Sequence, residues 1–316
     1  MAKLKHFLQS GKYNYFWPCN NFGLKQKILF IINPISGGKK KDRVPELIKK
    51  YIDHEKFNTL IVFSDGVSHA NLIAREAANS YQIIVAVGGD GTVNEVASAI
   101  KGTDVILGIV PFGSGNGLAR FLGIPLNLKK ALQTIFKGHT ELIDTATLNG
   151  MPFFNMAGLG FDAHISQVFS VDKNRGLFNY VKSSVWEFNH YNQQAYTITI
   201  DGVTYNKEAF MLSFANSSQY GNNAHISPRA SIKDGLIDVC IIRKFPFWRL
   251  LEMGLRMLFK ASEGTKYVEI LRGKKVLVQR SQPGSAHLDG EPRIVNDRVI
   301  IEIEPGSLRV FTGRKL

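Results

Sequence analysis

Cysteine and long apolar runs are both scarce in this sequence. Its two cysteines, Cys19 and Cys240, are too few for a disulfide framework and are typical of a reducing cytoplasm. No apolar run approaches the roughly 20 residues that cross a bilayer, and the N-terminal residues lack the apolar core of a signal peptide. We therefore expect a cytoplasmic protein.

Two common nucleotide-binding motifs are also absent. There is no Gly-x-x-x-x-Gly-Lys-Ser/Thr, which excludes a P-loop enzyme. No Gly-x-Gly-x-x-Gly follows the first predicted strand, which argues against the usual dinucleotide-binding fold. A nucleotide would have to be held by backbone N–H groups and small polar side chains from several loops.

Acidic side chains are outnumbered, with 26 Asp and Glu against 39 Lys and Arg, so the net charge is +13. This excess indicates an anionic partner, such as nucleic acid, a phosphorylated substrate or an acidic membrane surface. The basic residues are not interleaved with aromatics on a nucleic-acid-reading module, so we expect no nucleic-acid partner. Runs such as Lys39-Lys40-Lys41 are predicted to be exposed to solvent.

What is present from residue 27 onward is a regular alternation of apolar strands and helices. Near-continuous Ile, Leu and Val strands between helices predict a parallel sheet with helices on both faces. Residues 1–26 form a basic and aromatic N-terminal arm, and 27–147 are predicted to be a nucleotide-binding α/β domain. The predicted strands are 28–32, 59–63, 83–87 and 105–110, and the predicted helices are 44–52, 69–78 and 93–100.

After residue 148 the pattern changes to short alternating strands, which predict an antiparallel β-sandwich over 148–316. We expect a nucleotide cleft between the two domains, with the last strand a candidate to return to the first domain. A helix is predicted at 177–188, and strands are predicted at 196–200, 209–214, 237–242, 275–278, 298–303 and 308–311.

Each of the four strands predicted in the first domain ends in a loop of small and polar residues. Because parallel strands end at the same edge of a sheet, these loops predict one shared ligand site. The loops are 33–38, 64–66, 88–91 and 111–117.

The third of these loops begins the run Gly-Gly-Asp-Gly-Thr-Val-Asn-Glu, residues 88–95. Its glycines would let the backbone approach a ligand, and the helix that follows would present its N-terminus to phosphate. Asp90 would stand where Mg²⁺ or a reacting hydroxyl group could lie. The alternative is an ordinary junction in which Thr92 is the N-cap and Glu95 completes a capping box.

These motifs resemble the diacylglycerol kinase catalytic domain, whose superfamily includes sphingosine kinases, ceramide kinases and soluble bacterial lipid kinases. The resemblance covers roughly residues 27–312 and implies a first domain like those of phosphofructokinases and NAD kinases. It is carried by Asn33-Pro34 with Gly37-Gly38, the 88–95 run, Pro111–Asn116 with Ala119-Arg120, Gly158–Asp162, Pro228–Ala230 with Asp234-Gly235, and Asp289-Gly290-Glu291.

The resemblance implies an ATP-dependent lipid kinase that phosphorylates a hydroxyl group of diacylglycerol, a sphingoid base, ceramide or a related lipid. Mg²⁺ would be held by Asp234 with the carbonyls of Ser231 and Leu236, although Asp234-Gly235 alone looks like a hairpin turn. Ser64 stands where relatives usually have threonine. The implied nucleotide-site residues are Asn33, Ser64, Gly88, Gly89, Asp90, Gly91, Thr92, Asn94, Glu95, Ser114 and Glu291.

Two aspartates are candidates for the general base that accepts the hydroxyl proton. Asp289 matches the residue proposed in bacterial relatives, and Asp90 matches the one assigned this role in sphingosine kinases. Asp162 matches a region that contacts the lipid head group, where its carboxylate would pair with an amine; alternatively, it caps a turn. Gly117-Leu118 after Asn116 resembles sphingoid-type sequences more than diacylglycerol kinases.

The implied partners are a membrane lipid and an anionic membrane surface that the cytoplasmic enzyme binds peripherally and reversibly, with a homodimer as a possible assembly. Residues 244–260 would supply an apolar stripe for that surface, or would pack as a helix on the second domain's sheet. The members of that stripe are Trp248, Leu251, Leu255, Leu258 and Phe259, with Arg249, Arg256 and Lys260 beside them.

Two other functions are compatible with the motifs. The first is a kinase of a soluble substrate like the NAD kinases, although their Gly-Thr-Pro-Thr-Gly-Ser-Thr-Ala-Tyr stretch is absent. The second is a nucleotide- or lipid-binding protein without catalytic activity. The retention of Asp90, Asp234, Asp289 and Glu291 argues against the second.

Overall fold

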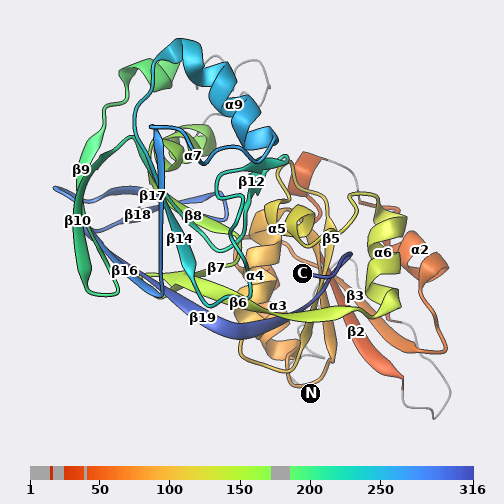
Figure 1. Ribbon diagram of the computed structural model, residues 1–316. Helices are drawn as coiled ribbons and strands as arrows, with labels where there is room; N and C mark the ends of the chain where they lie inside the picture. Colours follow the sequence, from red (N-terminus) through yellow and green to blue (C-terminus); the bar gives the residue numbers. More distant parts are fainter. Residues whose placement is uncertain (1–14, 17–24, 39–40, 172–185) are drawn as a thin grey trace. The chain divides into compact units, whose positions relative to one another are not determined.

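The computed structural model describes residues 15–16, 25–38, 41–171 and 186–316 (Figure 1). The chain forms two compact units: unit 1 comprises Met1–Ile143 with Gly306–Leu316, and unit 2 comprises Asp144–Pro305. Most of the N-terminal arm and of the helix predicted at 177–188 lies outside the described residues.

Unit 1 is built on a mainly parallel sheet. Strands β3, β2, β4 and β5 lie side by side in parallel, and the end of β19 continues the sheet beside β5. Five consecutive residues of β2 and all six of β4 are buried, as expected for a sheet covered on both faces. The strands are β1 (Tyr15–Phe16), β2 (Gln26–Ile32), β3 (Phe57–Phe63), β4 (Ile83–Gly88), β5 (Ile106–Pro111), β6 (Thr140–Leu148) and β19 (Arg298–Phe311), the last two continuing into unit 2.

Helices cover this sheet, with α3 and α4 on one side and α2 and α6 on the other (Figure 1). The predicted α/β fold is therefore confirmed. The boundaries of most elements of unit 1 differ from the predicted ones by one or two residues, and the largest difference is at α4, which begins at Asp90, three residues earlier than predicted, because the extended Gly89 is its N-cap. The helical segments are η1 (Ser36–Gly38), α2 (Val44–Tyr51), α3 (His69–Ala77), α4 (Asp90–Ile100), α5 (Gly117–Phe121) and α6 (Leu128–Lys137).

Unit 2 is an antiparallel β-sandwich, as predicted. One sheet has the order β19-β16-β9-β10 and the other β15-β14-β11-β8-β17-β18, and apolar side chains from both form one core. The strands are β7 (Met151–Phe153), β8 (Met156–Gly160), β9 (Gln194–Ile200), β10 (Val203–Ala209), β11 (Met211–Ala215), β12 (Gln219–Gly221), β13 (Ala224–His225), β14 (Ile237–Ile242), β15 (Val268–Gly273), β16 (Lys275–Gln279), β17 (Gly284–Leu288) and β18 (Glu291–Val295).

The strand pattern of unit 2 was predicted incompletely. β8 was missed because all five of its residues are buried, so no polar alternation marks it. The strands predicted at 298–303 and 308–311 are one continuous strand, β19. The strand predicted at 209–214 begins only at Met211, because Ala209 ends the missed strand β10.

The described helical segments of unit 2 include α7 (Phe161–Val171), η2 (Phe247–Arg249) and α9 (Leu250–Leu258), and residues 186–190 are helical as well. Within the described parts of the chain, no helix combines the length and apolar character needed to cross a bilayer.

Candidate active site

The carboxyl ends of β2, β3, β4 and β5 bring the predicted loops together in unit 1. Adjacent loops are joined at their first residues: Asn33 N donates to Val87 O at 3.0 Å, and Phe112 N donates to Gly88 O at 2.7 Å. The predicted gathering of four polar loops at one edge therefore follows from the parallel register.

Two acidic residues of α4 cap the neighbouring helices at this edge. The Asp90 carboxylate accepts hydrogen bonds from Asn116 N at 2.8 Å and Gly117 N at 2.9 Å, where α5 begins. The Glu95 carboxylate accepts from Ser68 N at 2.9 Å and Ala70 N at 3.1 Å, where α3 begins. These carboxylates thus satisfy N–H groups that a helix N-terminus leaves without intrahelical partners.

The capping box considered for Thr92 and Glu95 is wrong, because the N-cap of α4 is Gly89, which has no capping side chain. The hydroxyl group of Thr92 instead accepts a hydrogen bond from Asn33 Nδ2 at 3.0 Å, which links the first loop to the third. The N-terminus of α4 therefore differs from those of α3 and α5, which carboxylates cap.

The glycines at this edge are required by close backbone packing. A Cβ atom at Gly37, where φ is +62°, would collide with the carbonyl oxygen of Phe112. A Cβ atom at Gly113 would lie 2.7 Å from Gly89 Cα and 2.8 Å from Asn116 Oδ1. The loops therefore contact each other directly through their backbones. Only glycine, which has no Cβ atom, allows this close packing.

Lys41 is a functional candidate that the sequence reasoning missed. It was expected to be exposed, but it is 2% exposed, and its ammonium group donates to the carbonyls of Pro34 and Ser36. The Nζ atom also lies 5.3 Å from the centre of the Phe112 ring. A positive charge is thereby held beneath the first loop, and no periodic pattern in the sequence distinguishes this lysine from its neighbours.

The remaining predicted residues of this edge differ in exposure. Ser64 is buried directly after β3, and its N–H donates to Ile32 O at 2.9 Å. Ser114 is exposed to solvent, and Asn94 accepts a hydrogen bond from Ser98 Oγ at 3.3 Å within α4.

In unit 2, Asp289 and Gly290 form the tip of the β17–β18 hairpin, since Leu288 pairs with Glu291. Both tip residues have positive φ, +50° and +88°, as in a type I′ turn. Glu291 is the exposed first residue of β18. The Asp289 side chain therefore belongs to the turn, whereas the Glu291 side chain belongs to strand β18.

The Asp289 carboxylate is held by three backbone N–H groups. Asn155 N and Met156 N donate to Oδ1 at 2.9 and 3.0 Å, and Phe154 N donates to Oδ2 at 3.0 Å. The side chain has a fixed position before any substrate arrives.

A buried polar network supports this cradle. The Asn155 side chain donates to Gln219 O at 2.9 Å and accepts from Ser217 Oγ. Asn216 donates to the carbonyls of Phe154 and Asp144 at 2.8 and 2.9 Å. These residues were not singled out from the sequence, because buried Asn, Ser and Gln form no recognisable spacing.

Asp162 lies at the start of α7 and is enclosed by donors. Its carboxylate accepts from Ala163 N at 2.8 Å, His287 Nε2 at 3.0 Å, Tyr220 OH at 3.1 Å and Ser213 Oγ at 3.2 Å. Burial, and after it the charge of Asp162, raises the pKa of Tyr191 to about 12. The hydrogen bond from Ala163 N agrees with the turn-capping role that the sequence left open for Asp162. His287, which also donates to this carboxylate, was not singled out from the sequence.

Asp234 lies in an exposed turn before β14, and its Oδ1 accepts from Leu236 N at 3.1 Å. Because β14 pairs with β11 and β15, Asp234-Gly235 is not a hairpin turn between paired strands, so that alternative is wrong. Partial burial, followed by the charges of Asp238 and Asp144, raises the pKa of Asp234. A cation would relieve this repulsion, and carboxylate and carbonyl oxygens are the ligands that Mg²⁺ prefers.

Among the residues that the structure describes, no group of three or more His, Cys, Asp or Glu side chains could hold a metal ion. A cation at Asp234 would therefore depend on backbone carbonyls such as those of Ser231 and Leu236.

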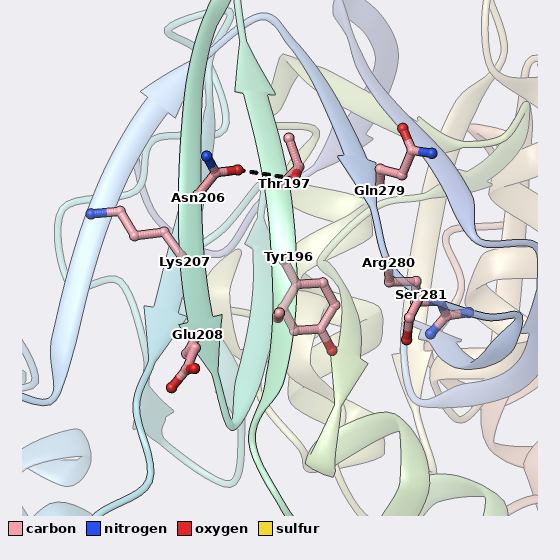
Figure 2. Close-up of a pocket in the computed structure, with 9 residues that line it drawn as sticks. Tyr196, Thr197, Asn206, Lys207, Glu208, Gln279, Arg280 and Ser281 are labelled. Carbon is pink, nitrogen blue, oxygen red and sulfur yellow. Dashed lines mark hydrogen bonds between the residues drawn. The ribbon is translucent and has the colours of Figure 1, made fainter.

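A pocket of about 610 Å³ opens elsewhere in unit 2, over strands β9, β10 and β16 (Figure 2). Thr197 and Asn206 lie side by side on the paired strands β9 and β10 and are joined by a 3.0 Å hydrogen bond, and the Lys207 ammonium pairs with Glu269. None of the residues predicted for the nucleotide, metal or substrate lines this pocket. It is therefore not the candidate active site.

Comparison with known proteins covers both units. Residues 27–148 match the family model described as diacylglycerol kinase catalytic domain, and residues 155–312 match the YegS C-terminal NAD kinase beta sandwich-like domain. The chain is 31% identical to a protein of Chromohalobacter salexigens named as a probable lipid kinase, YegS-like; the match spans 75% of this chain and 78% of that one.

Two further relatives agree. A protein of Bacillus subtilis named diacylglycerol kinase is 27% identical over 83% of this chain and 88% of its own length. A crystal structure described as a diacylglycerol kinase from Bacillus anthracis has a TM-score of 0.75 at 23% identity, covering 92% of this chain and 98% of that chain. At that identity the likeness in structure supports the fold alone.

Proposed function

This chain belongs to the kinase family that joins a diacylglycerol kinase catalytic domain to a YegS-type β-sandwich domain, and from that premise we propose that it transfers the γ-phosphate of ATP to a hydroxyl group of diacylglycerol. The family makes the protein a lipid kinase with ATP as phosphate donor. Four points go beyond the family and are proposed: the acceptor lipid, the roles of individual residues, the binding of Mg²⁺ and the association with a membrane.

The observation that carries the proposal for ATP is the difference among three helix N-termini at the strand edge of unit 1. Asp90 and Glu95 cap α5 and α3, while α4 begins at a glycine without a capping side chain. A phosphate group is a suitable partner for such an N-terminus. The charge of Lys41 beneath the first loop adds to the attraction.

In this proposal, Asp90 positions the nucleotide loops through α5, with Asn33, Ser64, Thr92, Asn94 and Ser114 beside the phosphates. Glu291 contributes to nucleotide binding from unit 2. Because phosphoryl transfer passes through a loose transition state, the protein acts mainly by positioning and by electrostatic stabilisation.

Asp289 is the proposed general base. Its three backbone hydrogen bonds hold the carboxylate in one orientation, which positions it to accept the proton of the lipid hydroxyl group. The proton needs to be accepted only late in the transfer, so a carboxylate is adequate.

Asp162 supports diacylglycerol rather than a lipid amine as the acceptor. Four donors already contact its buried carboxylate, three at Oδ2 and one at Oδ1, so a lipid amine would have to compete with them and enter a site that is only 7% exposed. The name of the Bacillus subtilis relative is consistent with this choice. A neutral head group can instead contact the donors around Asp162.

Mg²⁺ is proposed at Asp234, where a cation would favour the ionised carboxylate beside Asp238 and Asp144; Arg272, which pairs with Asp238, already offsets part of that negative charge. When bound, it would supply charge neutralisation in unit 2 and hold the turn between Ser231 and Leu236. The net charge of +13 further supports reversible, peripheral association with an anionic membrane that contains the substrate.

Transfer of label from γ-labelled ATP tests the function. The full chain would be incubated with diacylglycerol, ceramide, a sphingoid base or undecaprenol in mixed micelles, and with NAD in solution, before separation by thin-layer chromatography. We expect label in the diacylglycerol product. Label in NAD alone, or in no acceptor despite a folded protein, would contradict the proposal.

A further inference from the structure

Helix α9 of unit 2 carries two apolar faces instead of one. Its inner face, formed by Leu250, Met253 and Met257, packs against the core cluster around Phe188 and Phe245. This packing already gives the helix the buried stripe that holds it on the sandwich. A second apolar stripe on the same helix therefore needs a different explanation.

We define the outer stripe as Trp248, Leu251, Leu255, Leu258 and Phe259. Trp248 is 80% exposed, Leu251 74% and Phe259 78%, and the other two are about half exposed. Their spacing of three and four residues places them in one row on the helix surface. The alternative that this stripe packs on the sheet is thus wrong: the inner face fills that place.

A contiguous exposed stripe of this size is unusual for a water-soluble surface and marks a site of interaction. The turn that precedes α9 is firmly held, because Phe245 is buried and Lys244 Nζ donates to Tyr191 O at 2.7 Å. The end of the helix is held as well, since Ser262 Oγ donates to Ile226 O at 2.9 Å. Helix α9, whose course is drawn in Figure 1, is therefore held at both of its ends.

We propose that the outer stripe of α9 is the face with which the protein docks on an anionic lipid bilayer. This inference rests on the proposed lipid-kinase function, because the substrate of that function lies in a bilayer. Trp and Phe at the ends of the stripe match the side chains that anchor interfacial helices, whose polar flanks are rich in Arg and Lys.

Charge distinguishes the bilayer from a second copy of this chain as the occupant. Residues 247–260 contain Arg249, Arg256 and Lys260 against one acid, Glu252, which pairs with both arginines at 3.4 and 2.9 Å. Two copies meeting through this face would bring like-charged flanks together on molecules of net charge +13. An anionic head-group layer is complementary to the same flanks.

The test is sedimentation of the full chain with vesicles of phosphatidylglycerol and phosphatidylcholine, or of phosphatidylcholine alone. The wild type should bind the anionic vesicles, and binding should fall as salt rises. The double variant Trp248→Ser/Leu251→Ser should bind at least tenfold more weakly. A matched control, Leu126→Ser/Val203→Ser, removes exposed apolar side chains elsewhere and should bind within twofold of the wild type.

Folding of each variant is checked by circular dichroism, and Lys260→Glu provides a variant that leaves the stripe intact. Lys260→Glu should weaken binding to anionic vesicles severalfold without changing binding to neutral ones. The proposal is overturned if the double variant binds like the wild type. It is also overturned if analytical ultracentrifugation shows a lipid-independent dimer that the double variant abolishes.

Activity on detergent-dispersed diacylglycerol separates this inference from the proposed function. The docking variants should phosphorylate dispersed lipid at the wild-type rate, because no bilayer has to be bound. A wild type that binds vesicles through the stripe but phosphorylates no lipid would contradict the proposed function alone. An active wild type whose double variant still binds vesicles normally would contradict the docking face alone.

Discussion

At the strand edge of unit 1, the tightest contacts join backbone to backbone, as where Gly37 meets Phe112 and Gly89 meets Gly113. Around Asp162 and Asn155 in unit 2, the contacts are made by side chains from strands and loops that are distant in sequence. His287 and Asp162, for example, are 125 residues apart. Backbone packing requires glycine at fixed positions, whereas a side-chain network tolerates many residue combinations. The two regions should therefore respond differently to substitution.

The largest expected effect comes from adding a Cβ atom to the unit 1 loops. Gly37→Ala places it against the Phe112 carbonyl oxygen, so we expect a loss of several kcal/mol in the free energy of unfolding and loss of ATP binding. Gly38→Ala is the matched control, because its φ of +63° is nearly the same but no atom lies within 4 Å. That control should lose only about 1 kcal/mol. Equal losses in chemical denaturation would show that the close approach is unimportant.

A second comparison uses two hairpin tips of unit 2. Asp201 and Asp289 both begin Asp-Gly turns with positive φ, and both accept backbone hydrogen bonds. Asn tolerates this backbone conformation. Asp289→Asn should lower kcat at least a hundredfold, about 2.7 kcal/mol in the barrier, whereas Asp201→Asn should leave kcat within twofold.

If Asp289→Asn keeps the wild-type kcat per folded molecule, Asp289 is not the general base.

Acid unfolding supplies a further check on the control residue, Asp201. Backbone N–H groups of Lys274 and Lys275 lower the pKa of Asp201. The stabilising contribution of the Asp201 carboxylate is therefore present above its pKa in the unfolded chain, near 4. It is lost as the pH falls through the lower pKa that Asp201 has in the folded protein. Asp201→Asn should remove that part of the pH dependence.

The difference between the units also explains how far the sequence could be read. Glycine loops after four apolar strands predicted the edge of unit 1 because the residues that shape it lie within those loops. Lys41 escaped because burial of a lysine depends on carbonyls that only the folded loop places around it. In unit 2, the Asn155–Asn216 network and His287 escaped because long-range side-chain contacts leave no local pattern. The spacing of the apolar residues in the outer stripe of α9 could be recognised in the sequence, but the sequence did not indicate whether these side chains are buried or exposed.

A smaller effect is expected at Asp234, whose raised pKa means that its ionised form destabilises the fold. This cost is present at neutral pH and disappears as the pH falls through the raised folded value. Without Mg²⁺, Asp234→Asn should therefore raise Tm at pH 7 only slightly, because solvent screens this exposed side chain, and the gain should shrink in acid. Added MgCl₂ should raise the Tm of the wild type but not of the variant. If MgCl₂ does not change the Tm of the wild type, Asp234 does not hold Mg²⁺.

The central claim is that unit 1 holds ATP while Asp289 of unit 2 acts on the acceptor hydroxyl group. Calorimetric titration of Asp90→Asn and Asp289→Asn with a non-hydrolysable ATP analogue tests it most directly. An amide at position 90 keeps one of the two acceptors that hold the start of α5, so Kd should rise at least tenfold, about 1.4 kcal/mol. Asp289→Asn should leave Kd within twofold of the wild type. Equal weakening in both variants, or weakening in Asp289→Asn alone, would contradict the account.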